Sequence, residues 1–159
     1  MKRFALLGAV AAAALAFPGA ASAQSGHFVT GGANEPSCTD QGTTVSCTGK
    51  VAGLGGTTFE ITVDAVGTAS VECINPAGHR APGQDTTVET SGTTGTLPTP
   101  RNGQFVFSVA TLEPGPLPAT PTCPNEMWTP VITDVEFTEA TLTLLEDGVI
   151  SDQITVPVT

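Results

Sequence analysis

Apolar and polar side chains alternate strictly along residues 59–65, which read Phe-Glu-Ile-Thr-Val-Asp-Ala. A period of two is the signature of a strand with one buried and one solvated face. The alternation resumes at residues 69–73 and places Cys73 on the buried face. No window after residue 23 keeps the i, i+3, i+4, i+7 spacing of an amphipathic helix, because glycine, proline and 26 threonines interrupt every run. The pattern therefore predicts an all-β fold.

Further segments along the chain carry the same signal. Residues 104–109, 131–138, 140–144 and 150–158 alternate in this way, and residues 44–51 and 86–90 are rich in β-branched side chains. Asp147-Gly148 predicts a hairpin turn, since glycine accepts a positive φ. Pro157 predicts that the last strand lies at a sheet edge. The side chains expected on core faces are Phe105, Phe107, Val109, Val131, Thr133, Val135, Phe137, Ala140, Leu142, Leu144, Ile150, Ile154, Val156 and Val158.

Short, evenly spaced strands with Gly/Pro-rich turns are typical of a β-sandwich. We therefore expect one domain, residues 24–159, with an immunoglobulin-like sandwich of about seven to nine strands. A small β-barrel is the alternative. The cysteine–tryptophan–cysteine order of immunoglobulin domains is not met, because Trp128 follows all four cysteines.

The N-terminus has the features of a signal peptide. Lys2 and Arg3 precede an apolar run at residues 4–17, which is shorter than the roughly 20 residues that span a bilayer. Residues 21–23 read Ala-Ser-Ala, a pattern that signal peptidase accepts. We predict cleavage before Gln24, giving a secreted, extracellular protein with no membrane insertion after processing.

The four cysteines all lie beyond this cleavage point. An even number in an exported chain predicts two disulfides, for which three pairings are possible. We favour Cys38 with Cys47 and Cys73 with Cys123, because neighbouring cysteines of a β protein often join one hairpin. No Cys-x-x-Cys or Cys/His pair with metal-ligand spacing occurs, so we expect no metal and no cofactor at these residues.

The chain is strongly acidic, with 15 acidic and 5 basic residues and a formal charge of −10. Removal of Lys2 and Arg3 leaves three basic residues against the same 15 acids, a charge of −12. This balance excludes nucleic acid as a partner, because binding to phosphates needs a basic face. The expected partner is an extracellular protein or glycan that the sequence does not identify, and we expect the domain itself to be a monomer.

Two loops interrupt the rhythm of the strands: residues 75–84, and residues 113–125 with five prolines. If Cys73 pairs with Cys123, both loops meet at one end of the sandwich beside Trp128. Phe28 and Trp128 are the aromatic residues left outside the predicted core faces, and for Trp128 we favour packing against the core or a disulfide over a role as an exposed stacking ring. The binding residues predicted at this end are Asn75, His79, Arg80, Asn125 and Trp128.

Motifs around these loops carry a resemblance. Cys73-x-Asn75 is followed by Ala81-Pro-Gly-Gln84, and later come Cys123-Pro-Asn125, Trp128-Thr129 and Asp134-Val-x-Phe137. They resemble uncharacterised small secreted β-rich proteins of high-GC Gram-positive bacteria, over roughly the C-terminal two-thirds of residues 24–159. The resemblance implies export and a compact β domain, and no activity.

The sequence predicts no catalytic residues. It holds only His27 and His79, and no G-x-S-x-G elbow for a hydrolytic triad. The pairs Glu60 with Asp64 and Asp134 with Glu136 satisfy the composition of a glycosidase site, but they lie on polar strand faces. The acids near residues 146–148 lack the D-x-D-x-D-G spacing of a calcium loop, which favours an acidic turn.

The first functional hypothesis is a non-enzymatic, secreted binding or surface-interaction domain. The second is an inhibitor of an extracellular protease, in which the stiff stretch at residues 123–127 enters the protease. The third is a small hydrolase that acts on polysaccharide through a pair of carboxylates.

Overall fold

The computed structural model describes residues 25–159, so the predicted signal peptide, residues 1–23, lies outside the described residues. The described part contains ten strands and one short helix. They are β1 (His27–Phe28), β2 (Ser37–Asp40), β3 (Val45–Ala52), β4 (Thr58–Ile74), β5 (Arg80–Pro82), β6 (Thr86–Thr93), β7 (Leu97–Pro98), β8 (Phe105–Ala110), α1 (Ala119–Thr122), β9 (Thr129–Glu146) and β10 (Val149–Pro157).

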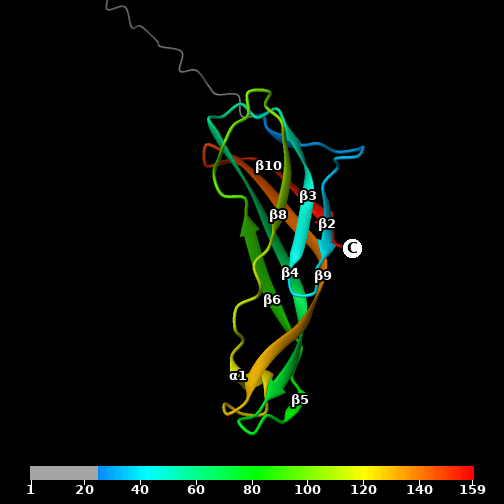
Figure 1. Cartoon of the computed structure of the whole chain (residues 1–159), viewed down its shortest axis with the longest axis vertical. Coiled ribbons are helices and arrows are strands. Elements are labelled where there is room, and N and C mark those ends of the chain that lie inside the picture. The colour runs from blue at the N-terminus through cyan, green and yellow to red at the C-terminus, as the bar shows by residue number, and fades with distance from the viewer. Residues whose placement is uncertain (1–24) are drawn as a thin grey trace, which may run out of the picture.

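The strands form two open antiparallel sheets, as a sandwich requires (Figure 1). In the first sheet β3 pairs with β1 and β2 and also with β8. The second sheet has the order β10-β9-β4, and β7, β6 and β5 pair in turn with the far side of β4. The all-β sandwich-like fold is confirmed, and the alternative of a small closed barrel is wrong. Within residues 25–159 no helix has both the length and the apolar character needed to cross a bilayer.

The last residues of the chain tie the two sheets together. Val158 forms a parallel bridge with Cys38 of β2. The backbone nitrogen of Asp40 donates to the carbonyl of Thr159 at 3.0 Å, and the nitrogen of Thr159 donates to the carbonyl of Cys38 at 3.1 Å. The edge position predicted from Pro157 is confirmed, because β10 ends the order of its sheet.

Two long strands dominate the second sheet. The alternation that predicts strands at residues 59–65 and 69–73 is continuous in β4, and the two segments predicted at residues 131–138 and 140–144 are one strand, β9. They pair from Phe59 opposite Glu146 to Ile74 opposite Thr129. The predicted hairpin is confirmed, because Asp147 and Gly148 both have positive φ, 48° and 80°, which suits a tight two-residue turn.

The core lies between the sheets and is filled by the inward faces of β3, β8, β4 and β9. Two aromatic pairs pack edge-to-face in it: Phe28 with Phe107 at 5.8 Å, and Phe59 with Phe105 at 5.0 Å between ring centroids. The expectation that Phe28 lies outside the core is wrong, since its side chain is buried. The short strand β1 carries it inward beside β3, a contact that local alternation does not reveal.

Bulges overturn part of the predicted alternation. The register of β9 against β4 skips Thr133, so Ile132 packs against the core while Val131 is 39% exposed. The register of β10 likewise skips Ser151, and Ile150 is 61% exposed instead of facing the core. One extra residue in a strand moves every side chain that follows it along the strand to the opposite face of the sheet from the one that alternation predicts. The assignments of Val131, Thr133 and Ile150 to core faces are therefore wrong.

A buried carboxylate joins three segments at the end of β9. Glu146 is fully buried. Its Oε2 accepts hydrogen bonds from the backbone nitrogen of Gly26 at 2.9 Å and from Ser151 Oγ at 2.7 Å. Its Oε1 accepts from the nitrogens of Gly55 at 2.6 Å and Gly56 at 3.2 Å. The bulge therefore aims Ser151 at Glu146, and the carboxylate connects the N-terminal segment, the β3–β4 loop and β10.

The neighbouring turn is built on a second carboxylate. Asp147 Oδ1 accepts hydrogen bonds from the hydroxyl of Thr57 at 2.6 Å and from the backbone nitrogen of Thr58 at 2.9 Å. These hydrogen bonds lower the pKa of Asp147 from 3.8 to about 2. Burial raises the pKa of Glu146, but its hydrogen bonds from Ser151 and the three glycine nitrogens outweigh this and leave the pKa below 4.5.

Replacing Gly92 by alanine should destabilise the fold. A Cβ at Gly92 would lie 1.8 Å from the carbonyl oxygen of Ala110, where β6 crosses the end of β8. We expect a loss of about 3 kcal/mol in the free energy of unfolding, measured by urea denaturation. Gly115→Ala is the control, because nothing lies within 4 Å of its Cβ position. Equal stability of the two variants would contradict the close approach.

The unfolding free energy should fall between about pH 4 and pH 2. Asp147 and Glu146 have lower pKa values in the folded protein than in the unfolded chain, so their stabilisation is present above about pH 4 and is lost as the pH falls. Asp147→Asn preserves a side chain that tolerates positive φ but removes the charge. We expect urea denaturation to show a shallower pH dependence for this variant, and a slope equal to that of the wild type would contradict the role of Asp147.

Candidate functional site

The predicted binding residues lie together at one end of the second sheet, the end that carries β5 and α1 in Figure 1. Ile74, the last residue of β4, pairs with Arg80 on one side and with Thr129 on the other. This register brings the β4–β5 turn next to the segment that leads into β9. We call residues 75–80 and 123–128 the tip, and all five predicted binding residues belong to it.

The first half of the tip is a closed turn organised by Asn75. Its Oδ1 accepts hydrogen bonds from the backbone nitrogens of Ala77 at 3.0 Å and His79 at 2.9 Å. Its own backbone nitrogen donates to the carbonyl of His79 at 3.0 Å. An asparagine in this position commonly closes a turn through its side chain. Asn75 therefore shapes the tip, while the side chain of His79 is exposed.

The second half is held in the same manner. Asn125 Oδ1 accepts from the nitrogen of Met127 at 3.0 Å, and the Asn125 carbonyl accepts from the nitrogen of Trp128 at 3.2 Å. Cys123 donates its backbone N–H to the carbonyl of Ala119 at 2.6 Å. The segment is thus a tight turn that follows α1 and precedes β9.

Both predicted disulfides are confirmed, and one of them anchors the tip. Cys38 and Cys47 are cross-strand partners of β2 and β3, with Cα atoms 4.1 Å apart. Cys73 and Cys123 have Cα atoms 5.8 Å apart and join β4 to the end of α1. The nitrogen of Gln84 also donates to the carbonyl of Thr122 at 2.9 Å. The two long loops are therefore joined at one end, as the pairing predicts.

The surface of the tip combines apolar and charged groups. Met127 is 71% exposed and Trp128 is half-buried. Arg80 Nη1 donates to Glu72 Oε2 at 2.5 Å, so the one arginine of the tip already has a carboxylate partner. The sequence placed Met127 in the segment that a protease inhibitor would insert, residues 123–127, but not among the predicted binding residues. A single methionine in a loop gives no sign in the sequence that its side chain is exposed.

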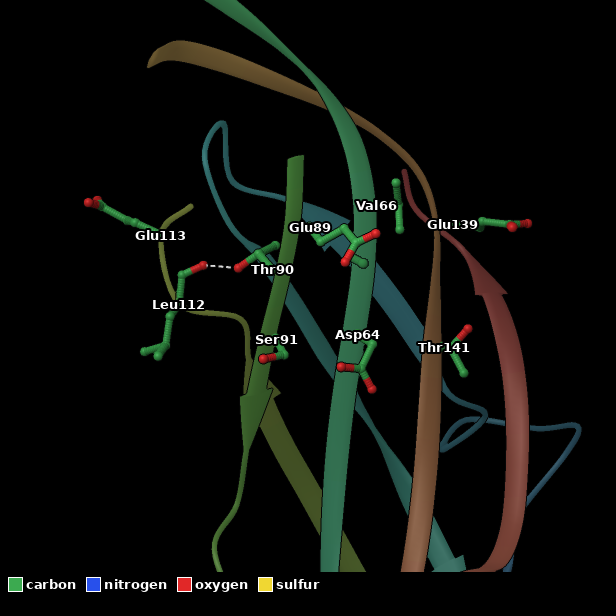
Figure 2. Close-up of a pocket in the computed structure, with 10 residues that line it drawn as sticks. Asp64, Val66, Glu89, Thr90, Ser91, Leu112, Glu113, Glu139 and Thr141 are labelled. Atoms are coloured by element: carbon green, nitrogen blue, oxygen red, sulfur yellow. Dashed lines mark hydrogen bonds between the residues drawn. The ribbon is translucent and has the colours of Figure 1, made fainter. Parts of the chain in front are cut away.

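A second feature, which sequence reasoning missed, is a groove on the outer face of the second sheet (Figure 2). It consists of two adjoining hollows of about 520 Å³ and 460 Å³ that share Asp64, Ser91 and Leu112. We call it the sheet-face groove. Five carboxylate side chains line it, those of Glu60, Asp64, Glu89, Glu113 and Glu139.

Only part of this groove is visible in the sequence. Alternation places Glu60 and Asp64 on the solvated face of β4. Val66, two residues after Asp64, lies on the same face. Glu89 of β6 lies opposite Val66 of β4, and this pairing brings it to the groove. Leu112 comes from a loop. Contacts that depend on strand register or on the course of a loop leave no local pattern in the sequence. The sequence therefore does not predict that Glu89 and Leu112 line the groove.

Glu60, which sequence reasoning pairs with Asp64 as a carboxylate couple, is held by threonines. Its Oε1 accepts from the hydroxyl of Thr93 at 2.6 Å, and its Oε2 accepts from the hydroxyl of Thr96 at 3.2 Å. Within residues 25–159 no group of three or more histidine, cysteine, aspartate or glutamate side chains is arranged to hold a metal ion. The carboxylates of the groove are spread along strands instead of converging on one point.

No family model, curated protein or solved structure matches the chain. The resemblance to small secreted proteins of high-GC Gram-positive bacteria therefore stays a prediction.

Removing the Cys73–Cys123 bridge should loosen the tip. The bridge spans 50 residues, so Cys73→Ala with Cys123→Ala should lower the unfolding free energy by about 4 kcal/mol and speed hydrogen exchange at residues 119–128. The control is Cys38→Ala with Cys47→Ala, which should cost about 3 kcal/mol and leave exchange at the tip unchanged. Unchanged exchange in the first variant would show that the bridge does not order the tip.

Proposed function

We propose that the protein is a secreted, non-enzymatic binding domain and that the tip is its contact surface. Residues 1–23 would direct export and then be removed, and two disulfides are compatible with an oxidising extracellular compartment. An immunoglobulin-like arrangement of the strands belongs to the same proposal. Its partner would be an extracellular protein or glycan.

The observation that carries the proposal is the exposure of Met127, next to the half-buried Trp128, on a backbone that a disulfide and several hydrogen bonds hold in place. A large apolar side chain on an ordered surface is typical of binding anchors, since little conformational entropy is lost when it is buried. Arg80 and His79, which are exposed in the other half of the tip, would supply polar groups that set the orientation of a partner. A scaffold with functional loops at one end is a common arrangement in β proteins.

A protease inhibitor would use the same exposed stretch, residues 123–127. The hydrogen bond from the Trp128 nitrogen to the Asn125 carbonyl closes this stretch into a turn. An extended backbone that pairs with the edge of a protease strand would need that bond to open. We therefore favour a binding domain over an inhibitor, and no geometric feature favours the hydrolase.

Trp128 offers a direct test, because the chain has no other tryptophan and no tyrosine. Purified protein is titrated with soluble cell-wall polysaccharide, peptidoglycan fragments and fractionated secreted proteins, and Trp128 emission is recorded. A binding partner should shift the emission. Met127→Ser with Trp128→Ala should then weaken retention on that immobilised partner by about tenfold or more.

The matched control is Val149→Ser with Ile150→Ser. These two side chains are 54% and 61% exposed on the β9–β10 hairpin, at the opposite end of the molecule from the tip (Figure 1). They should change retention less than about twofold. Full retention by the Met127/Trp128 variant, or an equal loss in both variants, would refute the tip as the contact surface.

A further inference from the structure

The sheet-face groove is a second surface, separate from the tip. It is lined by residues 60–66 of β4, whereas the tip begins after Ile74. Eight residues of extended strand between Val66 and Ile74 correspond to about 26 Å. Binding at the groove therefore need not involve any residue of the tip.

The floor of the groove is made of short side chains in register. Asp64 lies between Ser91 of β6 and Thr141 of β9. In the neighbouring row, Thr62 lies opposite Thr93 of β6. Because these side chains are small, the sheet leaves a channel that runs along β4 and is open to solvent.

One wall of the groove is Leu112, and its position is ordered. The backbone nitrogen of Leu112 donates to the carbonyl of Ser91 at 2.9 Å, and its carbonyl accepts from the hydroxyl of Thr90 (Figure 2). The backbone is thus fixed along the edge of β6, yet the residue is 74% exposed. Val66, on the floor, is 53% exposed. Leu112 and Val66 are thus two exposed apolar residues of the groove lining, and a bound partner would remove their surface from water.

The charge of the groove selects the partner. Its lining has five carboxylates and, among the described residues that form it, no lysine, arginine or histidine. Of the three lysine and arginine residues in residues 25–159, Lys50 lies on β3 in the other sheet, Arg80 is paired with Glu72, and Arg101 lies between β7 and β8. The net charge of the chain adds to the negative field over this face.

The spacing favours an extended peptide over a compact cation. Glu60 and Asp64 lie on the same face of β4, four residues and about 13 Å apart. Side chains on one face of an extended peptide recur every 6–7 Å or so, so two basic residues four positions apart would match the roughly 13 Å between Glu60 and Asp64. The other side chains of the peptide can contact Val66 and Leu112.

We propose that the sheet-face groove binds an extended, basic segment of a protein partner in which lysine or arginine side chains alternate with apolar ones. The basic side chains contact the carboxylates of Asp64, Glu89 and Glu113. The apolar side chains cover Leu112 and Val66.

The test uses fluorescein-labelled peptides and the purified protein, with fluorescence anisotropy as the readout. The first probe is a nine-residue peptide of alternating lysine and leucine, and the second replaces leucine by serine at equal charge. The lysine–leucine peptide should bind more tightly by about fivefold, since only it can bury Leu112. Trp128 emission should stay unchanged, which separates this site from the tip.

Two variants separate the electrostatic contribution to peptide binding from the apolar one. Glu89→Gln with Glu113→Gln should weaken binding of the lysine–leucine peptide about tenfold at low salt and less at high salt. Leu112→Ser should weaken it about fivefold at either salt concentration without lowering the thermal midpoint, because the side chain is exposed. The matched control, Glu35→Gln with Asp85→Asn, makes the same change in net charge at exposed residues that neither line the groove nor belong to the tip, and it should alter binding less than about twofold.

Three results would overturn the proposal. Equal weakening by the control pair would show that binding follows net charge alone. Equal affinity for the lysine–serine peptide or for spermine would show that the apolar wall is not used. Weakening by the Met127/Trp128 variant would place the peptide at the tip, and the proposal for the groove would then fail while the proposed function of the tip would not.

Discussion

The pairing of β4 with β9 is the interaction on which the rest of the structure depends. The ladder runs from Phe59 opposite Glu146 to Ile74 opposite Thr129, and its inward side chains form much of the core. Every other strand of the second sheet pairs with one of these two strands. Because so many backbone hydrogen bonds lie in one ladder, its two ends are fixed relative to each other, and the features at both ends take their positions from it.

Irregularities in this sheet have specific consequences. The bulge at Ser151 turns Ile150 outward and directs a hydroxyl to the buried Glu146, which also receives backbone N–H groups from the N-terminal segment and the β3–β4 loop. The bulge at Thr133 exchanges the faces of Val131 and Ile132. A carboxylate satisfied by hydrogen bonds can remain ionised in a buried position, so Glu146 holds its segments together at neutral pH.

The two candidate surfaces differ in how they are built. The tip is a loop surface made rigid by Cys73–Cys123 and by the side chains of two asparagines, and its exposed groups are both apolar and charged. The sheet-face groove is a strand surface with a floor of short side chains, carboxylates along it and an ordered Leu112 as its wall. Their chemistry favours different partners, and about 26 Å of strand separates them.

The sequence by itself determined the all-β fold class, the long strand β4 and the Asp147-Gly148 hairpin, because alternation and turn chemistry are local properties. It left three cysteine pairings open and favoured the one that the structure contains. It also predicted which loops meet at the tip, once Cys73 was paired with Cys123. Only the tertiary structure decided the bulges, the burial of Phe28 and Glu146, and the groove that Glu89, Leu112 and Glu139 share with β4. These depend on register and on contacts between residues far apart in the chain, and no local pattern records which residue on one strand lies opposite which residue on another.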